Sequence, residues 1–224
     1  MLKPLMLPHP VWWRKISPLA FAGLLALSGA LALPGAAAHA AQQSQGQVRI
    51  GEAVEAELAG NDGVTHRLSD YRGRIVVLEW TSPVCEFTAR HYASGAMQNL
   101  QKQALAQNVV WIPISSTGKG APGFMDAPQS QALMKARKIA SDYMALDASG
   151  TTGRYFSATA TPSVVIVDAQ GRLVYSGAID DKPFGDGMQG DNHVRAALAD
   201  LFAGAQVRLP KTRAYGCSIT YANP

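Results

Sequence analysis

Cysteine is scarce in this sequence: the 224 residues include only two, Cys85 and Cys217. So small a number excludes a scaffold held by many disulfides and a structural zinc site with four cysteine ligands. Charged residues are also sparse, at 16% of positions against 47% for hydrophobic ones. This composition is too apolar for a disordered chain and long enough to form one globular domain.

Acidic residues are absent from the first forty positions, which carry three basic ones, Lys3, Arg14 and Lys15. The whole chain has a net charge of +4 and a pI near 9.1. Beyond residue 40 it has 17 basic and 16 acidic side chains and is nearly neutral. The net positive charge of the whole chain therefore indicates neither nucleic acid nor an anionic membrane as a partner.

Residues 1–40 have the three parts of a cleavable signal peptide. The basic residues come first, residues 19–32 are almost wholly apolar, and Ala38-His39-Ala40 supplies the small-residue pattern at which signal peptidase cuts. We expect cleavage after Ala40 and export to a bacterial periplasm, where a disulfide is stable. The alternative is an uncleaved anchor, because the apolar stretch approaches the roughly 18 residues that span a bilayer.

The remaining sequence predicts a single α/β domain over residues 51–206, after a flexible start at 41–50. The expected elements are a hairpin turning at residues 60–63, strands at 74–80 and 109–115, helices at 86–107 and 129–142, a hairpin at 163–178, and a helix capped by Asp191 that ends near residue 202. This order implies three layers, with helices on both faces of a mixed sheet. Residues 207–224 form a tail, which is mobile unless tied down.

Cys85 follows the strand at 74–80 after a four-residue connection and begins the next helix. A thiol at this corner lies near unpaired amide groups and the positive end of the helix dipole, which favour the thiolate. The thiolate is the nucleophile of disulfide exchange. The alternative is a buried, unreactive cysteine.

Three segments carry a resemblance to a known family: VVLEWTSPVCEFTARHY at residues 76–92, Ala-Thr-Pro at 160–162, and the tail Lys-Thr-Arg-Ala-Tyr-Gly-Cys-Ser at 211–218. They resemble the thioredoxin-fold redoxins, of TlpA-like or AhpC/TSA-like type, over residues 51–221. The Gly-Cys-Ser tail is similar to that of a peroxiredoxin-like subgroup. The resemblance implies a thioredoxin-like three-layer α/β/α fold with a mixed central sheet and an added N-terminal hairpin.

On the family pattern of two cysteines separated by two residues, Cys85 takes the first position and Thr88 the second. Thr88 cannot resolve a mixed disulfide, although its hydroxyl could donate a hydrogen bond to a Cys85 thiolate. Cys217 is then the candidate resolving thiol. Alternatively, the two cysteines form a permanent disulfide, which the chain-entropy model values at roughly 4 to 5 kcal/mol. Free thiols or pairing between chains stay open.

The resemblance also assigns roles to three other residues. Glu79 matches a buried acid that relays protons to the active thiols, and burial would raise its pKa; the alternative is a glutamate that faces solvent or pairs with a base. Pro162 matches the cis-proline beside the nucleophile, and the Thr161 backbone would offer hydrogen bonds to an extended peptide. His91 is expected to lie beyond contact with Cys85, and His193 to lie at the surface.

We expect an exported thiol–disulfide oxidoreductase, a monomer without a cofactor, a metal, a nucleic-acid partner or a stable membrane anchor. Its partners would be protein thiols or disulfides, or small thiols or peroxides. A peroxiredoxin-like peroxidase is one alternative, although a peroxidatic cysteine would fall near Thr88. A non-catalytic protein with a structural disulfide is another. A copper-handling module is disfavoured because it needs a second local cysteine.

Overall fold

The structure is a computed structural model that describes residues 46–185 and 187–223. The expected signal peptide, and the flexible start up to residue 45, lie outside the described residues. None of the helices within these two ranges is long and apolar enough to cross a membrane.

A five-stranded mixed sheet forms the centre of the fold, in the order β5-β4-β3-β7-β8. Its strands are β3 (Val76–Trp80), β4 (Val110–Ser115), β5 (Ala145–Leu146), β7 (Ser163–Val167) and β8 (Leu173–Gly177). β3 runs parallel to β4 and antiparallel to β7, and all five of its residues are buried. Because β3 is covered on both faces, its sequence is a continuous apolar run broken only by Glu79.

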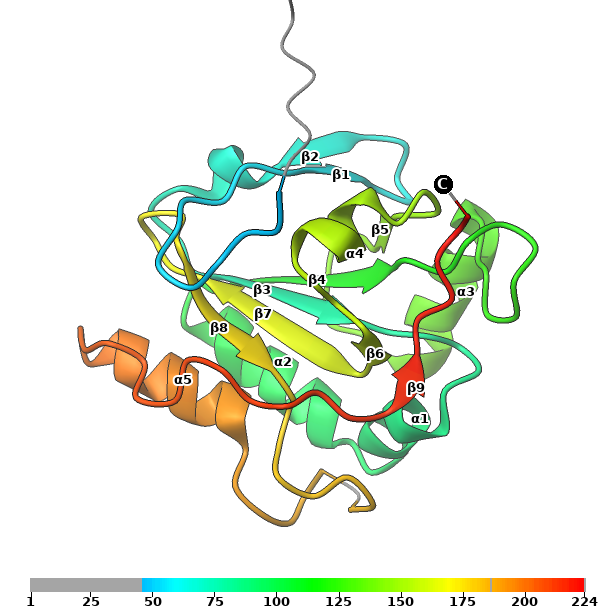
Figure 1. The fold of residues 1–224 in the computed structure, drawn as a ribbon. Helices are drawn as coiled ribbons and strands as arrows, with labels where there is room; N and C mark the ends of the chain where they lie inside the picture. The colour runs from blue at the N-terminus through cyan, green and yellow to red at the C-terminus, as the bar shows by residue number, and fades with distance from the viewer. Residues whose placement is uncertain (1–45, 186, 224) are drawn as a thin grey trace, which may run out of the picture. The chain divides into compact units, whose positions relative to one another are not determined.

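Helices and a hairpin cover the two faces of this sheet (Figure 1). One face carries α1 (Glu86–Ala93), α2 (Ala96–Ala106), α3 (Ala127–Arg137) and α5 (His193–Phe202). The other carries the hairpin of β1 (Glu57–Ala59) and β2 (Thr65–Arg67), the short helix η1 (Leu68–Tyr71) and α4 (Thr151–Tyr155). The predicted three-layer α/β fold with a mixed sheet and an added hairpin is confirmed, although four of the five α-helices lie on one face.

Three predicted helix boundaries were wrong. The single helix expected at 86–107 is divided into α1 and α2 by Gly95, whose φ of 82° a helix interior does not allow. The helix expected at 129–142 spans 127–137, where Asp126 forms its capping box and Lys138 ends it in the left-handed conformation. Asn192, not Asp191, caps α5, since its side chain accepts the Arg195 N–H.

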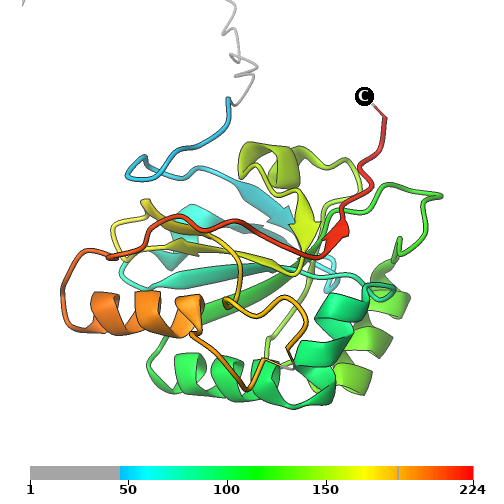
Figure 2. The same cartoon turned by 60° about the horizontal axis from the view of Figure 1, so that its bottom comes forward.

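The C-terminal tail is tied to the body along its length. The Ser176 N–H donates to the Pro210 carbonyl over 3.0 Å, and the Thr212 N–H donates back to Ser176 over 3.1 Å. Further on, β9 (Cys217–Ser218) pairs antiparallel with β6 (Ala160–Thr161) in a separate two-stranded sheet. Figures 1 and 2 show the tail, in red, passing β8 on its way from α5 to β6. The tail is therefore ordered, because its hydrogen bonds tie it to the body of the protein.

Candidate functional site: a disulfide at the start of α1

Cys85 is the N-cap residue of α1, where the connection from β3 ends. No side chain caps the first turn of this helix, so its backbone N–H groups face the cysteine end without a side-chain acceptor. The Cys85 residue is only 1% exposed. This is the strand-to-helix corner that the sequence predicted, and its amide groups and helix dipole favour a thiolate once the sulfur is reduced.

Cys85 and Cys217 form a disulfide, with Cα atoms 5.8 Å apart and a sequence separation of 132. Of the outcomes left open by the sequence, the structure contains the intramolecular pair.

The Thr161–Pro162 peptide bond is cis, and Thr161 lies directly against the disulfide. The Cys85 Sγ is 3.0 Å from the Thr161 carbonyl oxygen. In the disulfide this sulfur carries no proton, so the approach becomes a hydrogen bond only in the thiol form. In the β6–β9 ladder, Thr161 is opposite Cys217. The backbone edge predicted to take an extended peptide is therefore occupied by the protein's own tail.

Thr88 stands three residues after Cys85, on the first turn of α1, and is fully buried. Its Oγ1 has no hydrogen-bond partner within the part of the chain that the structure describes. A buried hydroxyl without a partner costs about 1 to 3 kcal/mol. A hydrogen bond from Thr88 to a Cys85 thiolate stays a prediction.

Glu79 is completely buried in β3, with its carboxylate turned toward α1 and α2. It accepts hydrogen bonds from the Trp111 indole (2.8 Å), the Tyr92 hydroxyl (2.8 and 3.0 Å) and the Gln101 amide (3.1 Å). Burial raises the pKa of Glu79, while these donors oppose the shift. None of its hydrogen bonds among the described residues goes to Cys85. Proton transfer between Glu79 and the Cys85 sulfur therefore stays a prediction.

Arg137, at the end of α3, braces the connection that leads to Cys85. Its guanidinium donates to the carbonyl oxygens of Ser82 (3.1 Å) and Pro83 (3.3 Å) and lies 5.4 Å from the centre of the Tyr92 ring. The sequence carries no signal for this role, because a lone arginine in a predicted helix has no distinguishing pattern. By holding both carbonyls, Arg137 fixes the path of the chain into α1.

Tyr215, two residues before Cys217, meets a buried polar pair. Its hydroxyl donates to Asp180 Oδ1 over 2.5 Å and lies 3.2 Å from His91 Nε2. His91 thus contacts the tail beside Cys217. Tyr215 and Asp180 carry no sequence signal, because Tyr221 is a second aromatic residue in the same tail and Asp180 belongs to no motif.

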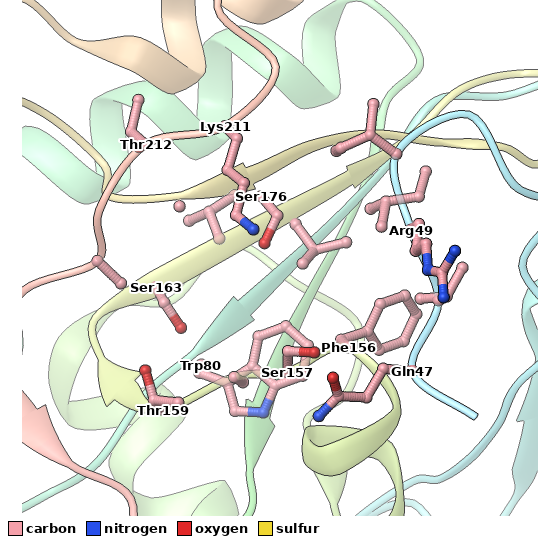
Figure 3. A pocket seen from close by; sticks show the side chains of 18 of the residues that line it. Gln47, Arg49, Trp80, Phe156, Ser157, Thr159, Ser163, Ser176, Lys211 and Thr212 are labelled. Atoms are coloured by element: carbon pink, nitrogen blue, oxygen red, sulfur yellow. The ribbon is translucent and has the colours of Figure 1, made fainter. Parts of the chain in front are cut away.

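Two cavities border the tail between its contact with β8 and the disulfide. One, of about 550 Å³, lies over the sheet, with Lys211 and Ser176 facing Trp80 and Phe156 across it (Figure 3). The other, of about 540 Å³, is lined by Thr212, Tyr215 and Gly216 of the tail together with Asp181 and other residues. This stretch of tail therefore lines both cavities while it contacts the body.

A thioredoxin-like fold with a disulfide-bonded cysteine at the start of a helix defines a redoxin, a class of redox enzyme. The chain belongs to the AhpC/TSA family, whose model matches residues 50–176. A comparison with curated proteins found no match. Among the described residues, no group of three or more His, Cys, Asp or Glu side chains is placed to hold a metal ion.

Solved structures with similar folds include two bacterial proteins that match 80% of this chain. A hypothetical protein from Sinorhizobium meliloti has 21% identity and a TM-score of 0.68 over 97% of its length. A conserved protein from Geobacillus kaustophilus has 20% identity and a TM-score of 0.70 over 95% of its length. The peroxidoxin BcpB from Mycobacterium tuberculosis has 17% identity and a TM-score of 0.51, covering 70% of this chain and 98% of that one. These likenesses establish the fold.

Proposed function

We propose that the protein is an exported thiol–disulfide oxidoreductase in which Cys85 and Cys217 form the working redox pair. One observation carries the proposal: the tail lies at Thr161 as an antiparallel strand, with its cysteine bonded to Cys85. An extended peptide whose cysteine is undergoing exchange would need the same arrangement, because main-chain pairing holds the peptide while its sulfur bonds to the nucleophile.

Oxidation of the pair begins at Cys85. Its thiolate attacks one sulfur of a substrate disulfide, so that a Cys85–substrate bond forms and the substrate S–S bond breaks, releasing a substrate thiolate. The Cys217 thiolate then attacks Cys85 Sγ, displaces the second substrate thiolate and closes the intramolecular disulfide. The substrate disulfide gains two electrons and two protons, and the Cys85/Cys217 dithiol loses them.

Reduction of the pair begins at the other sulfur. Cys85 is 1% exposed whereas Cys217 is partly exposed, so an incoming donor dithiol reaches Cys217. A donor–Cys217 bond forms, the Cys85–Cys217 bond breaks, and Cys85 leaves as a thiolate at the start of α1, where low basicity makes it a good leaving group. The second donor thiol then displaces Cys217, and the donor departs as a disulfide.

Peroxide reduction is the second candidate, and membership of the AhpC/TSA family favours it. The Cys85 thiolate would attack the peroxide, releasing an alcohol or water and leaving a sulfenic acid; Cys217 would condense with that acid, releasing water and forming the same disulfide. Thiol–disulfide exchange is preferred because the bound tail offers a peptide, not a small molecule, to Cys85.

The proposal of export rests on the sequence of residues 1–40. N-terminal sequencing of the protein from the periplasmic fraction is expected to begin at Ala41. An intact Met1 in a membrane fraction would support the anchor instead.

A turnover assay with a peptide disulfide and a dithiol donor tests the proposed activity. The wild-type protein should catalyse reduction, Cys85→Ser should fall to background, and Cys217→Ser should stop at a substrate adduct on Cys85 that mass spectrometry detects. Wild-type rates equal to background would contradict the proposal. Peroxide consumption dependent on Cys85, without disulfide exchange, would favour the peroxidase.

A further inference from the structure

The side chain of Tyr215 occupies a polar slot in the body of the protein. We define the slot by three residues, Asp180, His91 and Phe87. Asp180 accepts a hydrogen bond from the tyrosine hydroxyl, and His91 contacts the same oxygen. The Phe87 ring centre is 6.1 Å from the tyrosine ring centre. The His91 and Asp180 side chains are only 3% and 1% exposed. A buried carboxylate beside an imidazole, with an aromatic wall, is complementary to a phenol that donates its proton.

The slot favours tyrosine over aliphatic side chains by hydrogen bonding as well as by shape. Asp180 Oδ1 accepts hydrogen bonds from the Tyr215 hydroxyl and, over 2.9 Å, from the Lys182 backbone N–H. Asp180 Oδ2 has no hydrogen-bond partner among the described residues and lies 4.0 Å from His91 Nε2. Filling the slot with an aliphatic side chain would leave the buried carboxylate with the Lys182 N–H but without the tyrosine donor. Losing a hydrogen bond to a buried charged group is costly.

The spacing from the slot to the disulfide is two residues. Tyr215 reaches the body through its hydroxyl on Asp180, and Cys217 reaches it through the disulfide to Cys85. Gly216 between them forms a bend with a φ of 124°. This glycine lies so close to Thr161 that a Cβ would be 2.0 Å from the Thr161 carbonyl oxygen. The site therefore fits the sequence Tyr-Gly-Cys and leaves no room for a side chain at the middle residue.

We propose that the slot is a substrate subsite, and that the tail is a resident copy of the peptide it recognises. The substrates are polypeptide segments in which a tyrosine lies two residues before the reacting cysteine, with a glycine at the bend between them. The inference rests on the proposed function and adds its substrate class. Displacing the tail gives up the hydrogen bonds of Thr212 to Ser176 and of Tyr215 to Asp180, and a bound Tyr-Gly-Cys peptide restores the bond to Asp180. Cavities also border residues 211–216.

Synthetic peptides test the subsite while the protein stays constant. The protein carries Tyr215→Ala and Cys217→Ser, which empty the slot and leave Cys85 as its single thiol. The peptide Arg-Ala-Tyr-Gly-Cys-Ser-Ile carries thionitrobenzoate on its cysteine as a mixed disulfide. Attack by the Cys85 thiolate on the peptide sulfur forms a protein–peptide disulfide and releases coloured thionitrobenzoate, which gives the rate. Versions with Phe, Leu or Ala in place of Tyr, and Ala in place of Gly, complete the series.

The Tyr peptide should react at least about tenfold faster than the Leu and Ala peptides, as expected for loss of a hydrogen bond to a charged group. Phe should fall between them, and replacing Gly should slow the reaction. A protein with Cys217→Ser alone, which keeps Tyr215 in the slot, should react more slowly with the Tyr peptide.

Equal rates for the Tyr, Leu and Ala peptides would overturn the subsite while leaving the proposed function intact. Failure of every peptide, when the small disulfide dithiobis-nitrobenzoate still reacts with Cys85, would also overturn it. Failure of the small disulfide as well would count against the proposed function itself, because Cys85 would then not exchange.

Discussion

The corner that holds Cys85 and the tail that holds Cys217 differ in how the chain fixes them. Cys85 is placed mainly by its neighbours in sequence: a buried strand, a short connection and the first turn of α1, with Arg137 holding the connection. Cys217 is set by contacts with residues far away in sequence, at Ser176, Asp180 and Thr161. The disulfide thus joins a rigid thiol to one whose position depends on reversible interactions, and the predictions below test that contrast.

The largest expected effect is on stability. Cys217→Ser should lower the free energy of unfolding by about 4 kcal/mol, because the disulfide closes a loop of more than a hundred residues in the unfolded chain. Urea unfolding of the oxidised wild-type and of the variant measures the difference. Reduced wild-type protein should have the same free energy of unfolding as Cys217→Ser. If the reduced protein were as stable as the oxidised one, the disulfide would not stabilise the fold.

Gly216→Ala should have the next largest effect, about 3 kcal/mol, because the methyl group overlaps the Thr161 carbonyl and the residue has φ of 124°. Gly204→Ala is the matched control. That glycine also has a positive φ, of 69°, but nothing lies within 4 Å of its added Cβ, so only about 1 kcal/mol of backbone strain is expected. Equal losses in urea unfolding would show that the tail is not held tightly against Thr161.

The two sulfurs should also differ in accessibility. Reduced glutathione, a monothiol, should form its first adduct with the oxidised protein on Cys217, at least about tenfold in excess over Cys85, because the sulfur attacked must be reachable and the other must leave as a thiolate. Acid quenching and peptide mapping by mass spectrometry locate the adduct. If most of the glutathione adduct were on Cys85, Cys217 would not be the sulfur that an incoming thiol attacks.

The smallest effect concerns Glu79, whose pKa burial raises. As pH rises above the ordinary glutamate value, the unfolded chain loses this proton while the folded protein keeps it, so the folded state loses stability through Glu79. Glutamine at position 79 does not titrate, so the Glu79→Gln variant lacks this loss. The free energy of unfolding of the variant minus that of wild-type should therefore become more positive from pH 4.5 to 6.5, as measured by urea unfolding. A constant or falling difference would contradict the raised pKa.

Most of the body could be predicted from sequence because its signals are local. The apolar run of β3 and the Gly-rich hairpin turn each indicate their structure within a few residues, whereas the cis-proline at Pro162 was expected from the family resemblance. Gly95 lies inside the predicted helix. Its positive φ depends on how α1 and α2 pack against the sheet, which periodicity does not reveal.

The tail and its slot could not be predicted in the same way. Tyr215 meets His91 across 124 residues and Asp180 across 35, and β9 pairs with a strand of two residues. No short-range pattern marks such contacts. Sequence identified both cysteines, but not that the backbone edge of Thr161, expected to receive a substrate, is filled by the tail.

The reduction potential of the Cys85/Cys217 pair tests the central claim most directly, because it measures whether this disulfide works or only holds the tail. Equilibration of the protein with glutathione redox buffers, followed by alkylation and mass spectrometry, gives the value. The account predicts a potential above about −300 mV, as for labile and catalytic disulfides. A potential well below about −300 mV would mark a permanent structural bond and contradict it.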